Sequence, residues 1–146
     1  MISFYILFIM SILTIFYYGS YRCNNPTYKD ILEKKIGIYE LDGWSVSHFI
    51  FYLIIGYNFP QKKYLIIAFC FGLAWEIFEH MYGKHRPGWL GGYGGECDLS
   101  TDRLEGNWWY GKYSDIILNL LGLYIGYYLY KTKLIKKIFK IKKKFK

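Results

Sequence analysis

Four long apolar runs alternate with polar segments along the chain. The runs cover about residues 2–18, 44–59, 64–82 and 114–130. Their lengths lie near the ~17–25 residues with which a helix crosses a bilayer. A soluble helical bundle is the alternative, but soluble helices show a polar face on every turn, and the first two runs and most of the third show none. The pattern predicts an all-α, polytopic membrane protein with four transmembrane helices in one membrane domain, residues 1–130.

The first run has two interpretations. A cleaved signal peptide would have a basic segment before the apolar run and an A-x-A-like site after it, and neither is present. We therefore expect residues 2–18 to form a retained anchor helix. In the polar segment that follows, residues 24–26 (Asn-Asn-Pro) break the chain, and residues 27–37 read as a short surface helix ended by Gly37.

Positive charge is concentrated at the C-terminal end of the chain. The net charge is +8, with 53% hydrophobic and 23% aromatic residues, and nine of the nineteen basic residues fall in residues 131–146. Isoleucines and a phenylalanine are spaced among these lysines, so we expect a basic amphipathic tail on an anionic leaflet, with membrane lipids as partners. A nucleic-acid patch is the alternative. We expect no nucleic-acid partner, because nothing else here resembles a nucleic-acid-binding fold.

The same lysines orient the helices. Because basic loops stay in the cytoplasm, the tail is placed there, and an even number of spans puts the N-terminus on the same side. We expect a multi-pass integral membrane protein with cytoplasmic N- and C-termini. The segments 19–43 and 83–113 then face outward. Cys23 and Cys97 share that side and form a disulfide in an oxidising compartment or remain free thiols.

The polar residues within the runs fall at one depth. At 1.5 Å per residue, His48 lies ~6 Å along its helix from the outer side, and Glu76 lies ~18 Å along from the inner side. Asp115 enters from the outer side, with Asn119 one turn deeper. Ionisable groups in a span usually face the bundle interior or a wet cavity. The sequence therefore predicts a polar cluster at one membrane face, which Glu79 and His80 border.

These residue types suit acid/base or metal chemistry. Two close carboxylates can share a proton, and histidines transfer protons or bind metals. The candidate catalytic residues are Glu76, Asp115, His48 and His80, and the candidate substrate-binding residues are Asn119, Arg86, Arg103 and Glu79. Neither a cofactor nor a metal is identified by the pattern, and the oligomeric state is not indicated.

Each candidate also has a structural interpretation. Glu79 and His80 lie near the end of a span and can extend to lipid headgroups. His48 can act as a structural clamp between helices, with Asp115 as its partner. Asp115 can be a helix N-cap together with Ser114, because acids favour a helix N-terminus. The glycines of the fourth run suit close helix packing rather than chemistry.

The segment 83–113 is a long loop rich in glycine and tryptophan. Tryptophan is typical of the headgroup layer, so we expect this loop to cover the polar cluster. Arg86 and Arg103 can hold a phosphate or carboxylate. Pairing with acids of the same loop is the alternative.

The order of motifs over about residues 43–130 resembles the VanZ-like family of small membrane proteins. A histidine opens an aromatic-rich span in SHFIFYLIIGY, and Gly72 and Glu76 match a G-x-x-x-E motif. D-x-x-x-N-x-x-G-x-x-x-G is complete from Asp115 to Gly126. Glu79 replaces the family's glutamine, and the arginine that the family has before the aspartate has no close counterpart. The family takes its name from glycopeptide (teicoplanin) resistance. The resemblance implies the cell envelope and a lipid phase, not a particular reaction.

Two functions follow as hypotheses. In the first, the protein binds or modifies a lipid or a lipid-linked head group, with the polar cluster as acid, base or metal ligand. In the second, it is a non-catalytic membrane protein whose cluster holds helices together. An ion or proton pathway is disfavoured, because the inner half of each span lacks polar residues.

Overall fold

The computed structural model describes residues 2–25, 31–34, 36, 41–82 and 111–133. These residues form α-helices, one short 3-10 helix and connecting segments, and they contain no strand. The elements are α1 (Ile2–Asn24), η1 (Ile31–Glu33), α2 (Gly43–Asn58), α3 (Lys62–Tyr82) and α4 (Tyr113–Thr132). The predicted all-α class is confirmed.

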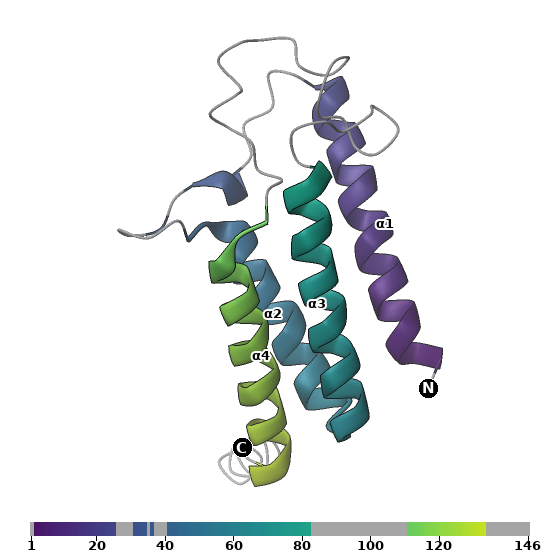
Figure 1. Ribbon diagram of the computed structural model, residues 1–146, viewed down its shortest axis with the longest axis vertical. Coiled ribbons are helices and arrows are strands. Elements are labelled where there is room, and N and C mark those ends of the chain that lie inside the picture. Colours follow the sequence, from purple (N-terminus) through teal and green to yellow (C-terminus); the bar gives the residue numbers. More distant parts are fainter. Residues whose placement is uncertain (1, 26–30, 35, 37–40, 83–110, 134–146) are drawn as a thin grey trace, which may run out of the picture.

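The four long helices lie side by side, and each runs opposite to the one before it in sequence (Figure 1). The start of α1, the connection 59–61 and the end of α4 lie at one end, which we call the turn end. Phe4 of α1 contacts Phe59 and Tyr64 there, with ring centroids 5.3 and 4.8 Å apart. At the opposite end, the loop end, α1 and α3 finish while α2 and α4 begin. The polar residues of α2, α3 and α4 therefore share the loop half of the bundle.

The helix bounds differ from the predicted ones at several ends. α1 continues to Asn24, beyond the predicted end at residue 18, and α3 begins at Lys62. Within the predicted surface helix 27–37 the structure has the 3-10 turn Ile31–Glu33. Residues 27–30, 35 and 37 of that segment, most of the Gly/Trp-rich loop, and the tail 134–146 lie outside the described residues. The predictions for the tail and for a Cys23–Cys97 disulfide therefore remain predictions.

Helices α2 and α4 form the most extensive contact between helices, and glycines make it possible. A Cβ atom at Gly122 would meet the Phe49 carbonyl oxygen at 2.5 Å, and one at Gly126 would overlap the Leu53 carbonyl oxygen. Gly56 of α2 allows the same close approach to α4, because a Cβ there would overlap the Leu123 carbonyl oxygen. Small residues let two backbones approach closely. The glycine stripe is therefore a packing surface, as its spacing suggests.

Apolar residues are distributed the opposite way from those of a soluble bundle. Large hydrophobic side chains on all four long helices are exposed, for example Ile9 (55%), Ile50 (50%), Ile77 (52%) and Ile117 (59%). The buried set, in contrast, contains seven polar or charged residues: Asp42, Ser45, Glu76, Glu79, Lys112, Asp115 and Asn119. Apolar surface of this extent suits contact with other apolar matter.

Two helices are long and apolar enough to cross a membrane. They are α1, over Ile2–Tyr21, and α3, over Lys62–Met81. α2 has 16 residues and is too short for the same criterion. α4 has 20 residues, but its acid, its amide and its tyrosines make it more polar. The structure thus supplies two candidate spans of the four predicted.

Candidate functional site

His48 and Asn119 join α2 to α4 at the centre of the polar residues. Asn119 is 1% exposed, and its Oδ1 lies 3.1 Å from His48 Nδ1. When Nδ1 carries the proton, the imidazole donates this hydrogen bond and Nε2 is left as an acceptor. The predicted partner of the His48 clamp was Asp115, and the structure gives Asn119 instead. The amide lies one turn deeper on the same stripe of α4, opposite the histidine on α2.

Glu76 enters the same cluster from α3. Its carboxylate is 3% exposed, and Oε2 accepts the backbone N–H of Lys112 at 2.9 Å. Oε1 lies 3.5 Å from His48 Nδ1. Gly111 allows the chain to pass this closely, because a Cβ there would overlap the Glu76 carbonyl oxygen. Residues 111 and 112, at the end of the loop, therefore pack onto the cluster, while the rest of the loop lies outside the described residues and its predicted position over the cluster stays a prediction.

Asp115 completes the group from the first turn of α4. One ligand-type atom each from His48, Glu76 and Asp115 lies within 4.8 Å of the others. The N-cap of α4 is Lys112, which makes no side-chain capping bond, so the interpretation of Asp115 as an N-cap is wrong. Asp115 is 4% exposed, and its Oδ1 lies 3.4 Å from the Ser114 hydroxyl. Asp115 is therefore inside the helix and directed into the bundle.

A buried ion pair lies beside the cluster. The Lys112 ammonium donates to Asp42 Oδ2, and Asp42 Oδ1 accepts the Ser45 backbone N–H at 2.8 Å. Asp42 thus caps the N-terminus of α2 and also pairs with Lys112, the residue directly before α4. The pair fixes the starts of both helices relative to each other. Buried charges are tolerated only when they are paired or hydrogen-bonded, and this pair uses the Lys112 side chain while its backbone holds Glu76.

Several buried polar atoms of the cluster have no hydrogen-bond partner among the described residues. They include Glu76 Oε1 and Asn119 Nδ2. Most buried polar groups in folded proteins are hydrogen-bonded, so each exception needs a reason. Gly72 of α3 leaves the space around the amide open, since a Cβ there would lie 2.9 Å from Asn119 Nδ2 and 2.5 Å from the Tyr52 hydroxyl. A bound group would give these two atoms the partners that the described residues do not supply.

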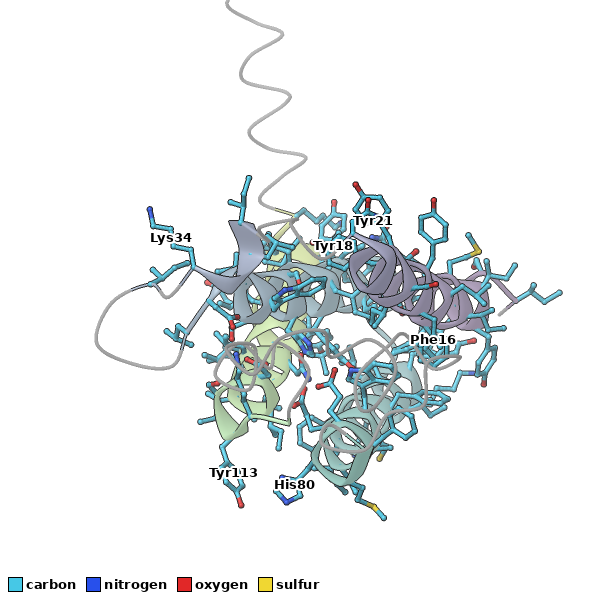
Figure 2. All side chains as sticks on the ribbon, turned by 90° about the horizontal axis from the view of Figure 1, so that it is seen from above. Phe16, Tyr18, Tyr21, Lys34, His80 and Tyr113 are labelled. Carbon is cyan, nitrogen blue, oxygen red and sulfur yellow. The ribbon has the colours of Figure 1, made fainter. Side chains whose placement is uncertain are left out.

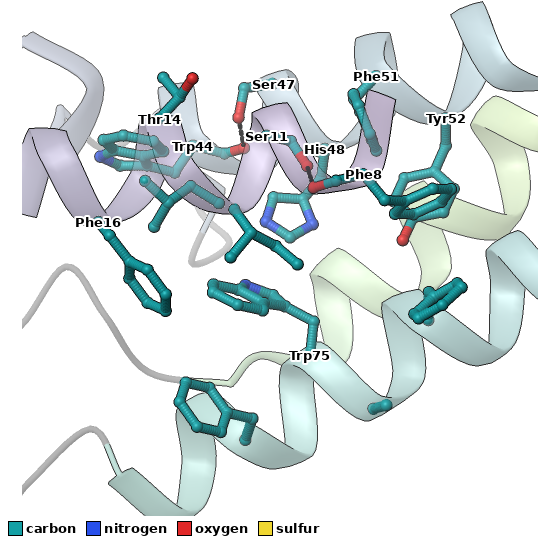
Figure 3. A pocket seen from close by; sticks show the side chains of 15 residues that line it. Phe8, Ser11, Thr14, Phe16, Trp44, Ser47, His48, Phe51, Tyr52 and Trp75 are labelled. Atoms are coloured by element: carbon teal, nitrogen blue, oxygen red, sulfur yellow. Dashed lines mark hydrogen bonds between the residues drawn. The ribbon is translucent and has the colours of Figure 1, made fainter. Parts of the chain in front are cut away.

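An apolar pocket of about 580 Å³ lies next to the cluster, between α1, α2 and α3. Figure 3 shows the His48 imidazole projecting from α2 into this pocket, above Trp75 of α3. The wall is mostly aromatic and aliphatic, and the hydroxyls of Ser11 and Ser47 are bonded to the backbone of their own helices, at Phe8 and Trp44. His48 therefore belongs to both the polar cluster and the apolar pocket.

The other predicted site residues are not brought into this group. Glu79 is buried, and it is not a member of the three-residue ligand group. The His80 side chain is exposed and extends outward from α3, as Figure 2 shows in the view along the bundle. Arg86 and Arg103 lie outside the described residues. Of the eight predicted site residues, the structure thus brings together His48, Glu76, Asp115 and Asn119.

Sequence reasoning missed three contributors, Asp42, Lys112 and Tyr52, and the packing role of a fourth, Gly72. Asp42 and Lys112 were missed because a pair seventy residues apart leaves no local pattern. Tyr52, which lines the pocket, lies one turn after His48 on the same helix and could have been found from that spacing. Gly72 had been noted for its place before Glu76, and its role in making room for the buried amide follows only from the packing.

Family models, curated proteins and solved structures were compared with the chain, and none of them matches it.

Proposed function

We propose that this chain is a VanZ-like integral membrane protein with four spans, which binds or modifies a lipid or a lipid-linked head group at one membrane face. The observation that carries the proposal is that His48 belongs both to the polar cluster and to the lining of the apolar pocket. Its ring joins a buried cluster of carboxylates and an amide to an apolar pocket of about 580 Å³. A lipid has the same two-part character, with a polar head joined to apolar chains.

The surface of the bundle supports the membrane part of the proposal. Exposed large hydrophobic side chains occur on α2 and α4 as well as on α1 and α3, so all four helices present apolar surface outward. Lipid tails accept such a surface without cost, whereas water does not. With the turn end at the cytoplasm, the N-terminus and the end of α4 share that side, and the cluster lies toward the opposite face.

The pocket supports the lipid part. It lies between α2 and the two helices that are long and apolar enough to cross a membrane, α1 and α3. Its aromatic lining matches an acyl or isoprenoid chain in polarity. Trp44 stands near its loop end, where tryptophan commonly marks the headgroup layer. A chain held there brings its head group to His48. The predicted contact of the basic tail with an anionic leaflet, and the predicted binding of a head group by Arg86 and Arg103, concern residues outside the described ones and stay predictions.

The chemistry available at that point is acid/base catalysis or electrostatic stabilisation. Glu76 and Asp115 can take up or share a proton, and His48 can pass it to a group in the pocket through the ring nitrogen not bonded to Asn119. Asn119 holds the ring rather than contacting the substrate, because its side chain is buried and is not part of the pocket wall. Asn119 is therefore a positioning residue in this proposal.

Whole-lipid mass spectrometry tests the proposal. Cells expressing the wild type are compared with cells expressing Asp115→Asn or Glu76→Gln at matched protein levels, because both changes keep the shape of the side chain and remove its charge. Asn58→Ala is the control, since Asn58 is exposed at the turn end and bonds only its own helix, at Ile54. We expect a lipid or carrier species to change with the wild type and the control, and to revert with both cluster variants. Identical profiles in all four would refute the proposal.

A non-catalytic, structural cluster is the second candidate, and one observation favours it. The cluster connects three helices, through His48 to Asn119 and through Glu76 to the Lys112 backbone, so it can act as an assembly joint. Under this alternative the charge-neutral variants lower thermal stability in detergent and leave the lipid profile unchanged. The same two measurements therefore separate the candidates.

A further inference from the structure

We propose that His48, Glu76, Asp115 and Asn119 form a binding site for one divalent metal ion, with one nitrogen and three oxygen ligands. The inference rests on the proposed function only in using the same cluster, and it specifies what the cluster holds. The ligand set is His48 Nδ1, Glu76 Oε1, one carboxylate oxygen of Asp115, and Asn119 Oδ1.

The spacing of the ligand atoms matches a single ion. A tetrahedral Zn²⁺ with bonds of about 2.0–2.1 Å holds neighbouring ligand atoms about 3.3 Å apart. His48 Nδ1 lies 3.1 Å from Asn119 Oδ1 and 3.5 Å from Glu76 Oε1. The atoms of His48, Glu76 and Asp115 all lie within 4.8 Å of one another.

The unsatisfied atom of Glu76 is directed into this group. Oε2 is held by the Lys112 N–H, while Oε1 is buried, has no hydrogen bond among the described residues, and faces His48. This is the arrangement of a metal-ligating carboxylate, in which an outer hydrogen bond orients one oxygen and the other binds the ion. A hydrogen bond between His48 and Asn119 leaves Oε1 without a partner, whereas an ion at the centre satisfies all three side chains at once.

Charge supports the same conclusion. Glu76 and Asp115 together bring two negative charges into a buried site, and buried charges are paired, neutralised by protons or bound to metals. The Lys112 ammonium is engaged with Asp42, and what Lys112 gives Glu76 is its backbone N–H. A divalent cation would offset both carboxylates. Among metals, an imidazole among oxygen ligands favours a transition ion such as Zn²⁺ or Mn²⁺ over Mg²⁺ or Ca²⁺.

The site also borders the apolar pocket, where a ligand can bind. With Nδ1 on the ion, the proton of His48 lies on Nε2, and His48 lines the pocket. The Nε2–H of His48 can then donate a hydrogen bond to a phosphate or carboxylate head group whose chain occupies the apolar space. The ligand class of the proposed function is therefore an anionic lipid or lipid-linked group.

The full-length protein, purified in detergent, is stripped with EDTA and titrated with Zn²⁺ and separately with Mn²⁺, and bound metal is counted by mass spectrometry of the elements. We expect about one ion per chain in the wild type. His48→Gln, Glu76→Gln and Asp115→Asn should each weaken binding tenfold or more, because each replaces an imidazole or a charged carboxylate by a neutral amide, which is a weaker ligand. His80→Gln is the matched control, since that histidine is exposed on the same helix as Glu76 and lies outside the group. Because thiols also bind Zn²⁺, the titration is repeated with the three cysteines changed to serine, and the result should not change.

A second measurement needs no variant. Zn²⁺ should raise the Tm of the stripped wild type in detergent, and EDTA should lower it again, because a ligand that binds only the folded state stabilises it. Absence of binding, or binding that survives all three ligand variants, would overturn the inference. If metal is absent but the lipid profile still depends on Asp115, the metal inference fails and the proposed function stands. If metal binds and no lipid species changes, the metal inference stands and the proposed function fails.

Discussion

Gly122→Ala tests the close packing of α2 against α4. A Cβ at residue 122 would lie 2.5 Å from the Phe49 carbonyl oxygen and 3.0 Å from the Leu53 nitrogen, whereas ordinary contact begins at 3.4 Å. The new methyl group is therefore about 0.9 Å too close to the carbonyl oxygen. That oxygen belongs to a helical backbone and cannot rotate aside like the end of a flexible side chain. The two helices must separate instead.

Separation of the helices costs stability in two ways. Overpacking of a tightly packed interior typically costs about 1–3 kcal/mol. Contact surface between α2 and α4 is lost as well, and His48 moves away from Asn119, to which it is bonded at 3.1 Å. The better helix propensity of alanine returns at most about 1 kcal/mol. We expect a net loss of about 1–3 kcal/mol, or a fall in Tm of roughly 3–10 °C for a chain of this size.

Thermal unfolding in detergent, followed by tryptophan fluorescence, measures this loss. Tyr124→Ala is the matched control on α4, since Tyr124 is 66% exposed and faces away from α2. We expect the control to unfold within about 2 °C of the wild type, because surface substitutions usually change stability by less than 0.5 kcal/mol. A Gly122→Ala protein as stable as the wild type would contradict the packing argument. It would also place α4 farther from α2 than the structure does.

Three further predictions concern the cluster and the pocket. Asn119→Ala should cost about 1–3 kcal/mol in thermal unfolding, because it leaves its partly buried imidazole partner without this hydrogen bond, whereas Asn58→Ala at the exposed turn end should cost almost nothing. Lys112→Met should cost about 3–5 kcal/mol by leaving the buried Asp42 charge alone, and the double change with Asp42→Leu should recover part of that loss; no recovery would mean that the two side chains are not coupled. Ser11→Phe should fill part of the pocket, so less lipid should copurify with the protein by mass spectrometry; an unchanged lipid content would place the lipid elsewhere.

Much of the site could be read from depth along the helices. A histidine near the start of one run, a glutamate near the end of another, and an aspartate near the start of a third must meet if the three helices are antiparallel neighbours. This holds whichever face of the membrane is outside, because rise per residue is a property of the α-helix itself. The structure brings His48, Glu76 and Asp115 within 4.8 Å of one another, which agrees with that count.

Depth alone did not select the members of the cluster. Glu79 and His80 lie at a similar depth to Glu76, but direction around the helix decides what a side chain meets, and the exposed His80 extends outward. Which helix packs closest to which was also open. The glycines of α4 meet α2, so Asn119 on their stripe faces His48 and becomes its partner.

The sequence by itself determined the four helices, their alternating direction and the layer in which the polar residues gather, because periodicity, helix rise and the rarity of charge within apolar runs are local properties. The tertiary structure alone decided the Asp42–Lys112 pair, the hold of the Lys112 backbone on Glu76, and the pocket between α1, α2 and α3. These depend on contacts between residues far apart in the chain, and on how each helix is turned about its own axis. The glycine stripe marks the face of α4 that packs, but which helix meets that face depends on where the small residues of both helices allow two backbones to approach.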